Sequence, residues 1–310
     1  MKFYPLMNIM LTFIMSLLGM AFYTLLERKT LSYTQRRKGP NKISILGFPQ
    51  PLADALKLLS KEMILPNLSN KPPFILSSIM TLFLSMFMWV LYPSMYPTHY
   101  FYWGVLLFIC ISSLNVYSIL MAGWSSNSKY SLLGTMRSIA QSISYEISML
   151  LTLLNILLMT QSYDMSVMSF LLITWTSLIF LPLFLSWSIS ILAETNRAPF
   201  DFTEGESELV SGFNTEFSAG MFTMIFMAEY LSIMFISMMT AMLFTGSLPL
   251  LSLNSMFFML KSLMCMFMFL WIRSCYPRLR YDQLMNLCWK TLLPFALASL
   301  LLFIPMNMML

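Results

Sequence analysis

Charge is scarce in this sequence. Only 10% of the 310 residues are charged, whereas 58% are hydrophobic, and the mean hydropathy is +0.73. Soluble domains carry about 25% charged residues, so this composition excludes a water-soluble globule and predicts an integral membrane protein. The few charged residues are informative, because a charge is unfavourable in hydrocarbon unless it is paired, hydrated or placed at an interface.

Ligands for cofactors are equally scarce. The single histidine, His99, excludes a bis-histidine haem, and the four cysteines form no CxxC pair and lack the spacing of an iron–sulfur site. Neither GxGxxG nor GxxxxGK[ST] occurs, which argues against a nucleotide site. We therefore expect this chain to bind no metal and no redox cofactor. Any redox chemistry would depend on cofactors held by neighbouring proteins.

Long apolar runs, in contrast, are plentiful. A helix needs about 20 mostly apolar residues to cross the hydrocarbon core of a bilayer. Eight stretches meet this requirement, which predicts an all-α membrane protein with a single integral membrane domain over residues 1–310. The predicted spans are 4–26, 73–92, 100–122, 134–159, 168–192, 217–242, 253–273 and 285–305.

The cations indicate the orientation of these spans. Sixteen of the eighteen Lys and Arg residues lie in or next to the first, third, fifth and seventh connections, and only Lys2 and Lys261 belong to the other side. Such a bias sets the orientation of membrane proteins. An odd number of spans would disrupt the partition, so we predict eight spans with both termini on the low-charge side. Lys261, inside the seventh span, could pair with a carboxylate or extend toward the interface.

The first connection contains an amphipathic segment. In PLADALKLLSKE (51–62), apolar residues such as Leu52, Leu56 and Leu59 recur at helical spacing, with polar residues on the opposite face. A helix of this length is too short to cross the membrane, so we expect it to lie in the interface plane. Even as an ordinary amphipathic anchor, it would mark a place where another molecule meets the edge of the membrane.

Two glutamates lie deep within predicted spans. Glu146 follows Gly134 by twelve residues, which corresponds to about 18 Å of helix, and Glu229 lies at a similar depth in 217–242. Arg137 points to the opposite face of its helix and cannot neutralise Glu146 there. Burial favours the neutral form of a carboxyl group, and acids at such depths pass protons through helix bundles. A protonated, hydrogen-bonded clamp between helices is the structural alternative.

The segment AETNRAPFDFTEGESELVSG (193–212) is acidic, with Arg197 as its only cation. Its carboxylates are Glu194, Asp201, Glu204, Glu206 and Glu208. Aromatic and aliphatic residues alternate with the charges and Pro199 interrupts them, unlike an ordinary solvated charge run. We predict that the loop 193–216 folds back and lines a polar cavity at the membrane face. A solvated surface loop is the alternative.

Several motifs resemble those of a known family and run in order along most of the chain. They are LLERKTLSYTQRRKGPN (25–41), PQPLADALKLLSKE (49–62), SYEI (144–147), AETNRAPFDFTEGESELVSGFNTE (193–216), FMAEY (226–230) and YPRLRYDQLM (276–285). Together they resemble subunit 1 of the membrane arm of NADH:ubiquinone oxidoreductase, respiratory complex I. The 32 methionines resemble the composition of animal mitochondrially encoded members. This resemblance implies the mitochondrial inner membrane, with the cation-rich side facing the matrix and both termini facing the intermembrane space.

The resemblance also implies a function and a set of partners. The chain would form the membrane part of a ubiquinone tunnel and the first part of a proton-translocation path, with ubiquinone as substrate. NADH, FMN and the iron–sulfur clusters would belong to peripheral-arm subunits, which also bind the quinone headgroup. Adjacent small membrane-arm subunits and membrane lipids would be further partners, and no nucleic acid would be bound.

The functional residues implied by the resemblance fall into three groups, none of them catalytic in the strict sense. The residues expected to line the quinone tunnel are Arg28, Ala53, Asp54, Lys57, Phe226, Tyr230 and Arg273. The residues expected to form the proton path are Asp54, Glu146, Glu194, Glu204, Glu206, Glu208 and Glu229. The residues expected to support them are Arg137, Tyr145 and Arg197.

Two other functions compete with this one. A stand-alone secondary transporter would use Glu146 and Glu229 for proton coupling. Transporters are commonly built from matching halves with interrupted helices, and neither an internal repeat nor the low glycine content, 10 residues, favours that architecture. A purely structural anchor for a peripheral complex would explain the basic loops but would leave the buried acids without a purpose.

Overall fold

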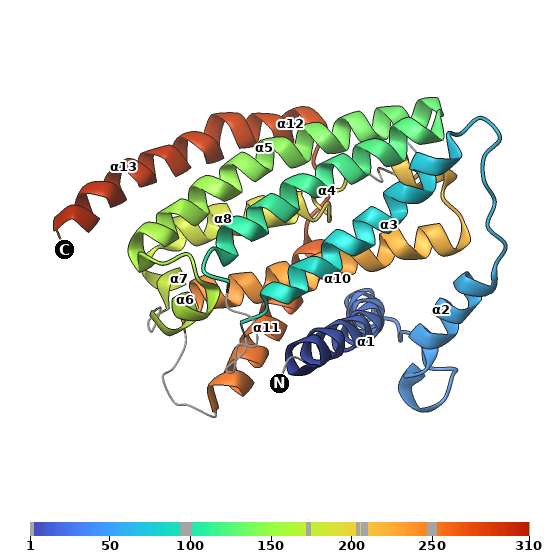
Figure 1. Ribbon diagram of the computed structural model, residues 1–310, viewed down its shortest axis with the longest axis horizontal. Coiled ribbons are helices and arrows are strands. Elements are labelled where there is room, and N and C mark those ends of the chain that lie inside the picture. Colours follow the sequence, from blue (N-terminus) through green and yellow to red (C-terminus); the bar gives the residue numbers. More distant parts are fainter. Residues whose placement is uncertain are drawn as a thin grey trace.

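The computed structural model describes residues 3–93, 101–171, 175–202, 205, 210–246 and 253–309. Regular secondary structure within these ranges is helical throughout. The long helices form an elongated bundle in which α3, α4, α5 and α10 lie side by side (Figure 1). The principal helices are α1 (Phe3–Thr34), α2 (Gln50–Ser60), α3 (Lys71–Met88), α4 (Gly104–Ser126), α5 (Lys129–Thr160), α8 (Leu181–Glu194), α10 (Ala219–Phe244), α11 (Leu253–Cys275) and α13 (Leu293–Met309).

Seven helices within the described ranges are long and apolar enough to cross a membrane. They are α1, α3, α4, α5, α10, α11 and the segment that joins α12 (Tyr281–Leu287) to α13. The chain is therefore a multi-pass membrane protein.

The segment 168–192, predicted as one span, is not a continuous helix in the described residues. It is divided among α6 (Met165–Leu171), α7 (Thr176–Ile179) and α8. Pro182 stands in the first turn of α8, where its missing N–H group has no helical partner to lose. The Thr176 hydroxyl donates a 2.8 Å hydrogen bond to the carbonyl of Leu243, which fastens the interruption to the end of α10. Pro182 thus begins a helix instead of kinking one.

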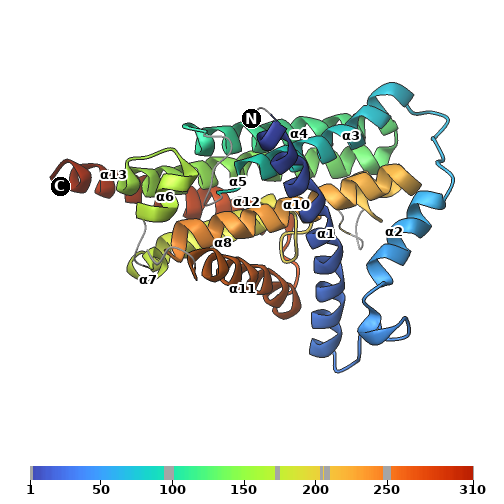
Figure 2. The ribbon, with the colours of Figure 1, turned by 60° about the horizontal axis from the view of Figure 1, so that its bottom comes forward.

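The centre and the periphery of the bundle differ in burial. In the most apolar stretch of α10, 67% of the residues are buried within the chain, compared with 17% in the corresponding stretch of α1. Figure 2 shows α1 crossing the direction of α10 instead of running beside it. The helix also continues eight residues past the predicted end of its span at residue 26. This extension carries Glu27 and Arg28.

Small residues allow the central helices to approach closely. A Cβ atom placed on Gly123 of α4 would lie 1.8 Å from Cγ2 of Thr135 on α5, so only glycine fits at this crossing. Large side chains fill the space on the other faces, among them Phe108, Trp187 and Phe235, each at most 1% exposed. Helices in lipid associate through such close packing, because the hydrophobic effect does not drive them together there.

A widened turn of π-helix, Cys288–Leu292, joins α12 to α13. The following Pro294 has no N–H group and its ring clashes with the carbonyl of Lys290 in a regular α-helix, and the widened turn relieves that conflict. The Tyr145 hydroxyl of α5 donates a 2.9 Å hydrogen bond to the carbonyl of Leu284 in α12. Beyond the turn, α13 lies along α5 at the outer edge of the bundle (Figure 1).

Lys261 of α11 contacts the end of α10. Its Nζ atom donates hydrogen bonds of 2.9 and 2.5 Å to the carbonyl oxygens of Thr245 and Gly246. The last carbonyls of a helix lack intrahelical donors and carry partial negative charge. The partner of Lys261 is therefore a helix C-terminus, whereas the sequence left open a carboxylate or an extension toward the interface.

The amphipathic segment 51–62 contains α2, which packs against α1 and α10. Its apolar residues Leu52, Leu56 and Leu59 are 55%, 69% and 63% exposed. The apolar stripe of α2 is therefore not consumed by packing within the chain, and remains available to lipid or to another protein.

Candidate functional site

A buried carboxylate, Glu27 of α1, joins three other elements. Only 6% of its side chain is exposed. Its Oε1 atom forms an ion pair with Nη1 of Arg273 on α11, and Nη1 of Arg197 lies 3.9 Å from the same oxygen. Its Oε2 atom accepts a 2.6 Å hydrogen bond from the hydroxyl of Tyr230 on α10. Side chains far apart in the sequence thus meet at one negative charge.

Arg197, in the loop after α8, connects this carboxylate with a second one. Its Nη2 atom lies 4.0 Å from Oε2 of Glu229, and only 15% of its side chain is exposed. Its guanidinium carbon also lies 4.5 Å from the centroid of the Tyr230 ring. At an effective dielectric near 20, unit charges about 4 Å apart interact by roughly 4 kcal/mol. A change of charge beside Glu27 is therefore felt at Glu229 through Arg197.

Three of the residues predicted to line a quinone tunnel lie at this cluster. Tyr230 and Arg273 both contact Glu27. The Phe226 ring packs against Tyr230 with centroids 4.6 Å apart. Phe226 and Tyr230 form an aromatic surface on α10 that ends at the buried carboxylate of Glu27.

The other predicted tunnel residues lie where α1 meets α2. Nη1 of Arg28 is 2.5 Å from Oδ2 of Asp54, and the Gln50 amide donates a 2.8 Å hydrogen bond to the other oxygen of that carboxylate. Arg28 is 48% exposed and Asp54 33% exposed. Ala53 and Lys57, also on α2, are exposed.

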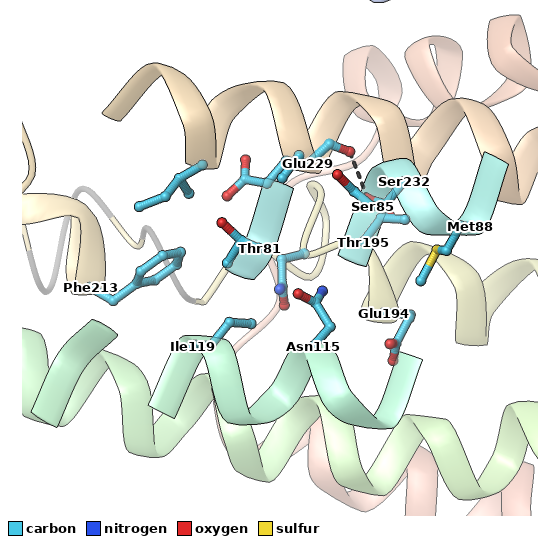
Figure 3. Close-up of a pocket in the computed structure, with 13 residues that line it drawn as sticks. Thr81, Ser85, Met88, Asn115, Ile119, Glu194, Thr195, Phe213, Glu229 and Ser232 are labelled. Atoms are coloured by element: carbon cyan, nitrogen blue, oxygen red, sulfur yellow. Dashed lines mark hydrogen bonds between the residues drawn. The ribbon is translucent and has the colours of Figure 1, made fainter. Parts of the chain in front are cut away.

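A polar cavity of about 50 Å³ lies between α3, α4, α10 and the end of α8 (Figure 3). Its polar lining includes Thr81, Ser85, Asn115, Glu194, Glu229 and Ser232. A water molecule needs about 10–15 Å³ of such volume, so there is room for about three. Glu194 and Glu229 therefore share a space in which water can bridge them.

Glu194 lies at the edge of this cavity, as the last residue of α8 (Figure 3). Its Oε2 atom is buried, and among the residues that the structure describes it has no hydrogen-bond partner. The carboxyl group of Glu146 on α5 is close enough to repel it electrostatically. In turn, the Ser112 hydroxyl of α4 donates a 3.3 Å hydrogen bond to Oε1 of Glu146. The cavity supplies room for the donor that Glu194 lacks.

The remaining predicted residues fall outside this arrangement. Glu204, Glu206, Glu208 and His99 lie outside the described residues. Tyr145 is buried, and its hydroxyl connects α5 with α12 instead of contacting an acid. Arg137 is partly buried on α5.

The sequence interpretation assigned no role to Glu27, Ser112 or Asn115. Glu27 is part of the motif 25–41, but the predicted first span ends one residue before it, which places Glu27 in the predicted loop. Extending the helix by two turns would have placed Glu27 on the face of Tyr23, four residues earlier. The Tyr23 ring contacts Tyr230, with centroids 5.8 Å apart. Ser112 carries no comparable signal, because buried serine residues are common in these helices, and Asn115 is a partly buried residue with no motif around it.

Comparison with known proteins covers nearly the whole chain. The family described as NADH dehydrogenase matches residues 7–304. The chain is 48% identical to NADH-ubiquinone oxidoreductase chain 1 of Heterololigo bleekeri over 287 residues, 92% of each chain. It is 48% identical to the protein of that name from Anopheles gambiae over 301 residues, which is 97% of this chain and 95% of the relative. It is 50% identical to the corresponding Emballonura alecto protein over 299 residues, 94% of this chain and 93% of that one. With a family match that extends over almost its full length, the chain belongs to the NADH dehydrogenase family.

Proposed function

We propose that this chain is the core membrane subunit of the proton-pumping NADH:ubiquinone oxidoreductase that forms the membrane part of the ubiquinone tunnel and the first part of the proton-coupling path. The name shared by its relatives supports this function. The observation that carries it is a continuous series of charged and polar groups. The series is Arg273, Glu27, Arg197, Glu229, the polar cavity, Glu194 and Glu146.

The proposed setting is the mitochondrial inner membrane. Eight spans cross it, with α6, α7 and α8 together serving as the fifth, and both termini face the intermembrane space. The partition of cations supports this orientation, because it places sixteen of eighteen on the matrix side. The exposed apolar stripe of α2 supports its placement in the plane of the interface.

The proposed tunnel wall is made by α1, α2 and α10. The apolar tail of ubiquinone enters from lipid along this wall and passes the Phe226 and Tyr230 rings. The polar headgroup lies beyond, on the side where Arg28, Asp54 and Arg273 place their charges. Partner subunits of the peripheral arm hold FMN and the iron–sulfur clusters, oxidise NADH and deliver the electrons, so this chain supplies binding surface and electrostatics but no redox group. Small membrane-arm subunits and lipids cover its remaining faces.

The proposed coupling starts with the charge change at the quinone. Reduction takes up protons as well as electrons, and this alters the field at Arg273 and Glu27. Arg197 interacts with both Glu27 and Glu229, so a weaker attraction to one strengthens its effect on the other. A proton then moves between Glu229 and Glu194 through water in the cavity. The new charge on Glu194 acts on Glu146, from which the change passes to the next membrane subunit. Because these sites are coupled, they titrate as a group.

A stand-alone proton-coupled transporter is the alternative. The three relatives compared are named as oxidoreductase chains, which does not favour it. Purification from the membrane discriminates between the two functions. A complex subunit is recovered only with flavin- and iron–sulfur-bearing partners, whereas a transporter is recovered alone and in a folded state.

The proton path is tested by the variant Glu146→Gln in the intact complex. The amide keeps the size of the side chain and the Ser112 contact but cannot exchange a proton at this position. Loss of a proton-transfer group lowers rates by about 10²–10⁴-fold, so we expect proton pumping coupled to quinone reduction to fall by about 10²-fold, with assembly intact. Pumping is measured in sealed vesicles.

Asp282→Asn is the matched control for this measurement. Asp282 is 72% exposed and pairs with Arg280 at the surface, so its loss should leave pumping unchanged. Full pumping by Glu146→Gln would remove Glu146 from the path.

The tunnel is tested with a photoreactive ubiquinone analogue. We expect it to label residues 49–62 or the stretch of α10 around Phe226 and Tyr230, and an excess of unmodified ubiquinone should suppress the labelling. Labelling confined to other subunits would contradict the tunnel assignment.

A further inference from the structure

Gln141 of α5 is a fully buried amide that the proposed path does not use. Its Nε2 atom donates hydrogen bonds to two backbone carbonyls, those of Ala193 and Phe200, both at 2.9 Å. These carbonyls bound a segment of eight residues that contains Glu194 and Arg197. A single side chain therefore closes this segment into a loop and fastens it to α5.

A carboxamide supplies both donors at this position without a charge. A primary amide carries two N–H donors on one nitrogen, and both are used here. Leucine offers no donor, and glutamate offers one when protonated and none when ionised. Asparagine is one methylene shorter, so its nitrogen does not reach both carbonyls from the same place on the helix.

The tether places the loop relative to the deep carboxylate. Gln141 precedes Glu146 by five residues, which is about 7.5 Å along the helix axis. Since Ala193 is adjacent to Glu194, the bond to its carbonyl fixes Glu194 relative to the helix that bears Glu146. The bond to Phe200 holds the other end of the segment, three residues after Arg197.

The opposite side of the loop is held by contacts of another kind. Nη2 of Arg278 lies 3.3 Å from Oδ2 of Asp201. The backbone N–H of Leu279 donates a 3.1 Å hydrogen bond to the carbonyl of Pro199. These contacts tie the loop to the segment between α11 and α12, but neither connects it to α5. Gln141 thus supplies two hydrogen bonds between the loop and the helix of Glu146.

We propose that Gln141 is the positioning residue of the proton path, because its two hydrogen bonds hold Glu194 beside Glu146 and Arg197 between Glu27 and Glu229 at the same time. This inference rests on the function proposed above. The inference extends the proposed function by naming the group that holds the quinone side and the carboxylate side of the path in a fixed position relative to each other. Gln141 itself carries no proton and contacts no substrate.

The test compares Gln141→Leu with Asn155→Leu in the assembled complex reconstituted in vesicles. Asn155 is a matched control, because it is also a fully buried amide of α5 but donates to Ser299 and Ala296 on α13. Both variants lose two hydrogen bonds of one amide. We expect Gln141→Leu to lower coupled turnover about tenfold and to reduce the number of protons pumped per NADH oxidised. Asn155→Leu should leave that ratio at its wild-type value, whatever its effect on the amount of complex.

A second variant guards against loss of packing as the explanation. Gln141→Glu keeps the size of the side chain but has at most one donor, so it should also lower the ratio of protons to NADH. An unchanged ratio in Gln141→Leu and Gln141→Glu, or an equal decrease in Asn155→Leu, would overturn the inference.

Failure of the inference is distinguishable from failure of the proposed function. If Glu194→Gln and Glu146→Gln pump normally, the proton path itself is wrong. If these two variants lose pumping while Gln141→Leu retains its full ratio, the path stands and only the role of Gln141 is rejected.

Discussion

Glu27 and Glu194 are both buried carboxylates, but their surroundings are opposite. Glu27 is surrounded by Arg273, Arg197 and the Tyr230 hydroxyl. Glu194 has a carboxyl oxygen without a hydrogen-bond partner in the described residues, a second carboxyl group nearby and a cavity beside it. The same residue type is therefore paired with cations in one place and, in the other, placed beside a cavity with a carboxyl oxygen that lacks a described hydrogen-bond partner.

The two sites differ in which neighbouring charges would lose their partner if the carboxylate were neutralised. Neutralising Glu27 leaves the mostly buried Arg197 and the partly exposed Arg273 without their shared counter charge, so the ion cluster resists a change of charge. Neutralising Glu194 relieves repulsion from Glu146 and strands no described cation. A path that carries protons needs both kinds of site, because a fixed charge sets the field to which the exchangeable group responds.

The largest effect should come from removing the fixed charge. Glu27→Gln leaves the mostly buried Arg197 and the partly exposed Arg273 beside a neutral amide, and the cost of about 3–5 kcal/mol for breaking a fully buried pair is the upper bound here. We expect little assembled complex, measured by native electrophoresis, and a lower thermal midpoint of what remains. Glu194→Gln is the matched control, since it makes the same chemical change and should assemble normally. Normal assembly of Glu27→Gln, or an equal defect in Glu194→Gln, would remove the distinction between the two sites.

A smaller effect should follow from trimming the same cluster. Tyr230→Phe deletes the hydrogen bond to Glu27 but keeps the ring under Arg197. Hydrogen bonds to charged groups contribute about 1.5–3 kcal/mol, so the complex should assemble with a reduced thermal midpoint and a raised KM for ubiquinone. Tyr33→Phe, at an exposed position of α1, should alter neither quantity. An unchanged KM in Tyr230→Phe would place the quinone away from this ring.

The smallest effect on stability should come from the exposed pair at α2. Arg28 and Asp54 are partly solvated, and pairs of this kind contribute about 0–1 kcal/mol. Asp54→Asn should therefore leave the thermal midpoint nearly unchanged, while quinone reduction falls because Arg28 loses its counter charge within the proposed tunnel. Asp282→Asn, at another exposed ion pair, provides the comparison. A large loss of stability in Asp54→Asn would show that the pair serves the fold and not the substrate.

Much of this arrangement was predictable, and the exceptions have physical causes. The apolar runs predict helices because lipid requires backbone groups to bond within their own segment, and long helices do occupy seven of those runs. The run 168–192 predicts one continuous helix because its composition is apolar throughout, whereas Pro182 and the Thr176 contact with α10 divide it into shorter helices. Glu27 was overlooked because the end of an apolar run is not the end of a helix. The role of Glu27 follows only from its contacts with Tyr230 on α10 and Arg273 on α11.

The amino-acid sequence alone determined that this chain lies in a membrane, because that depends on local composition. It also predicts which face carries the positive charge and which acids lie deep, from the distribution of cations and from distance along one helix. Only the tertiary structure decided which carboxylates are paired and which are not. That distinction depends on contacts among α1, α5, α10, α11 and the loop after α8, and Coulomb interactions are set by separation in space and by burial, neither of which can be read along the chain.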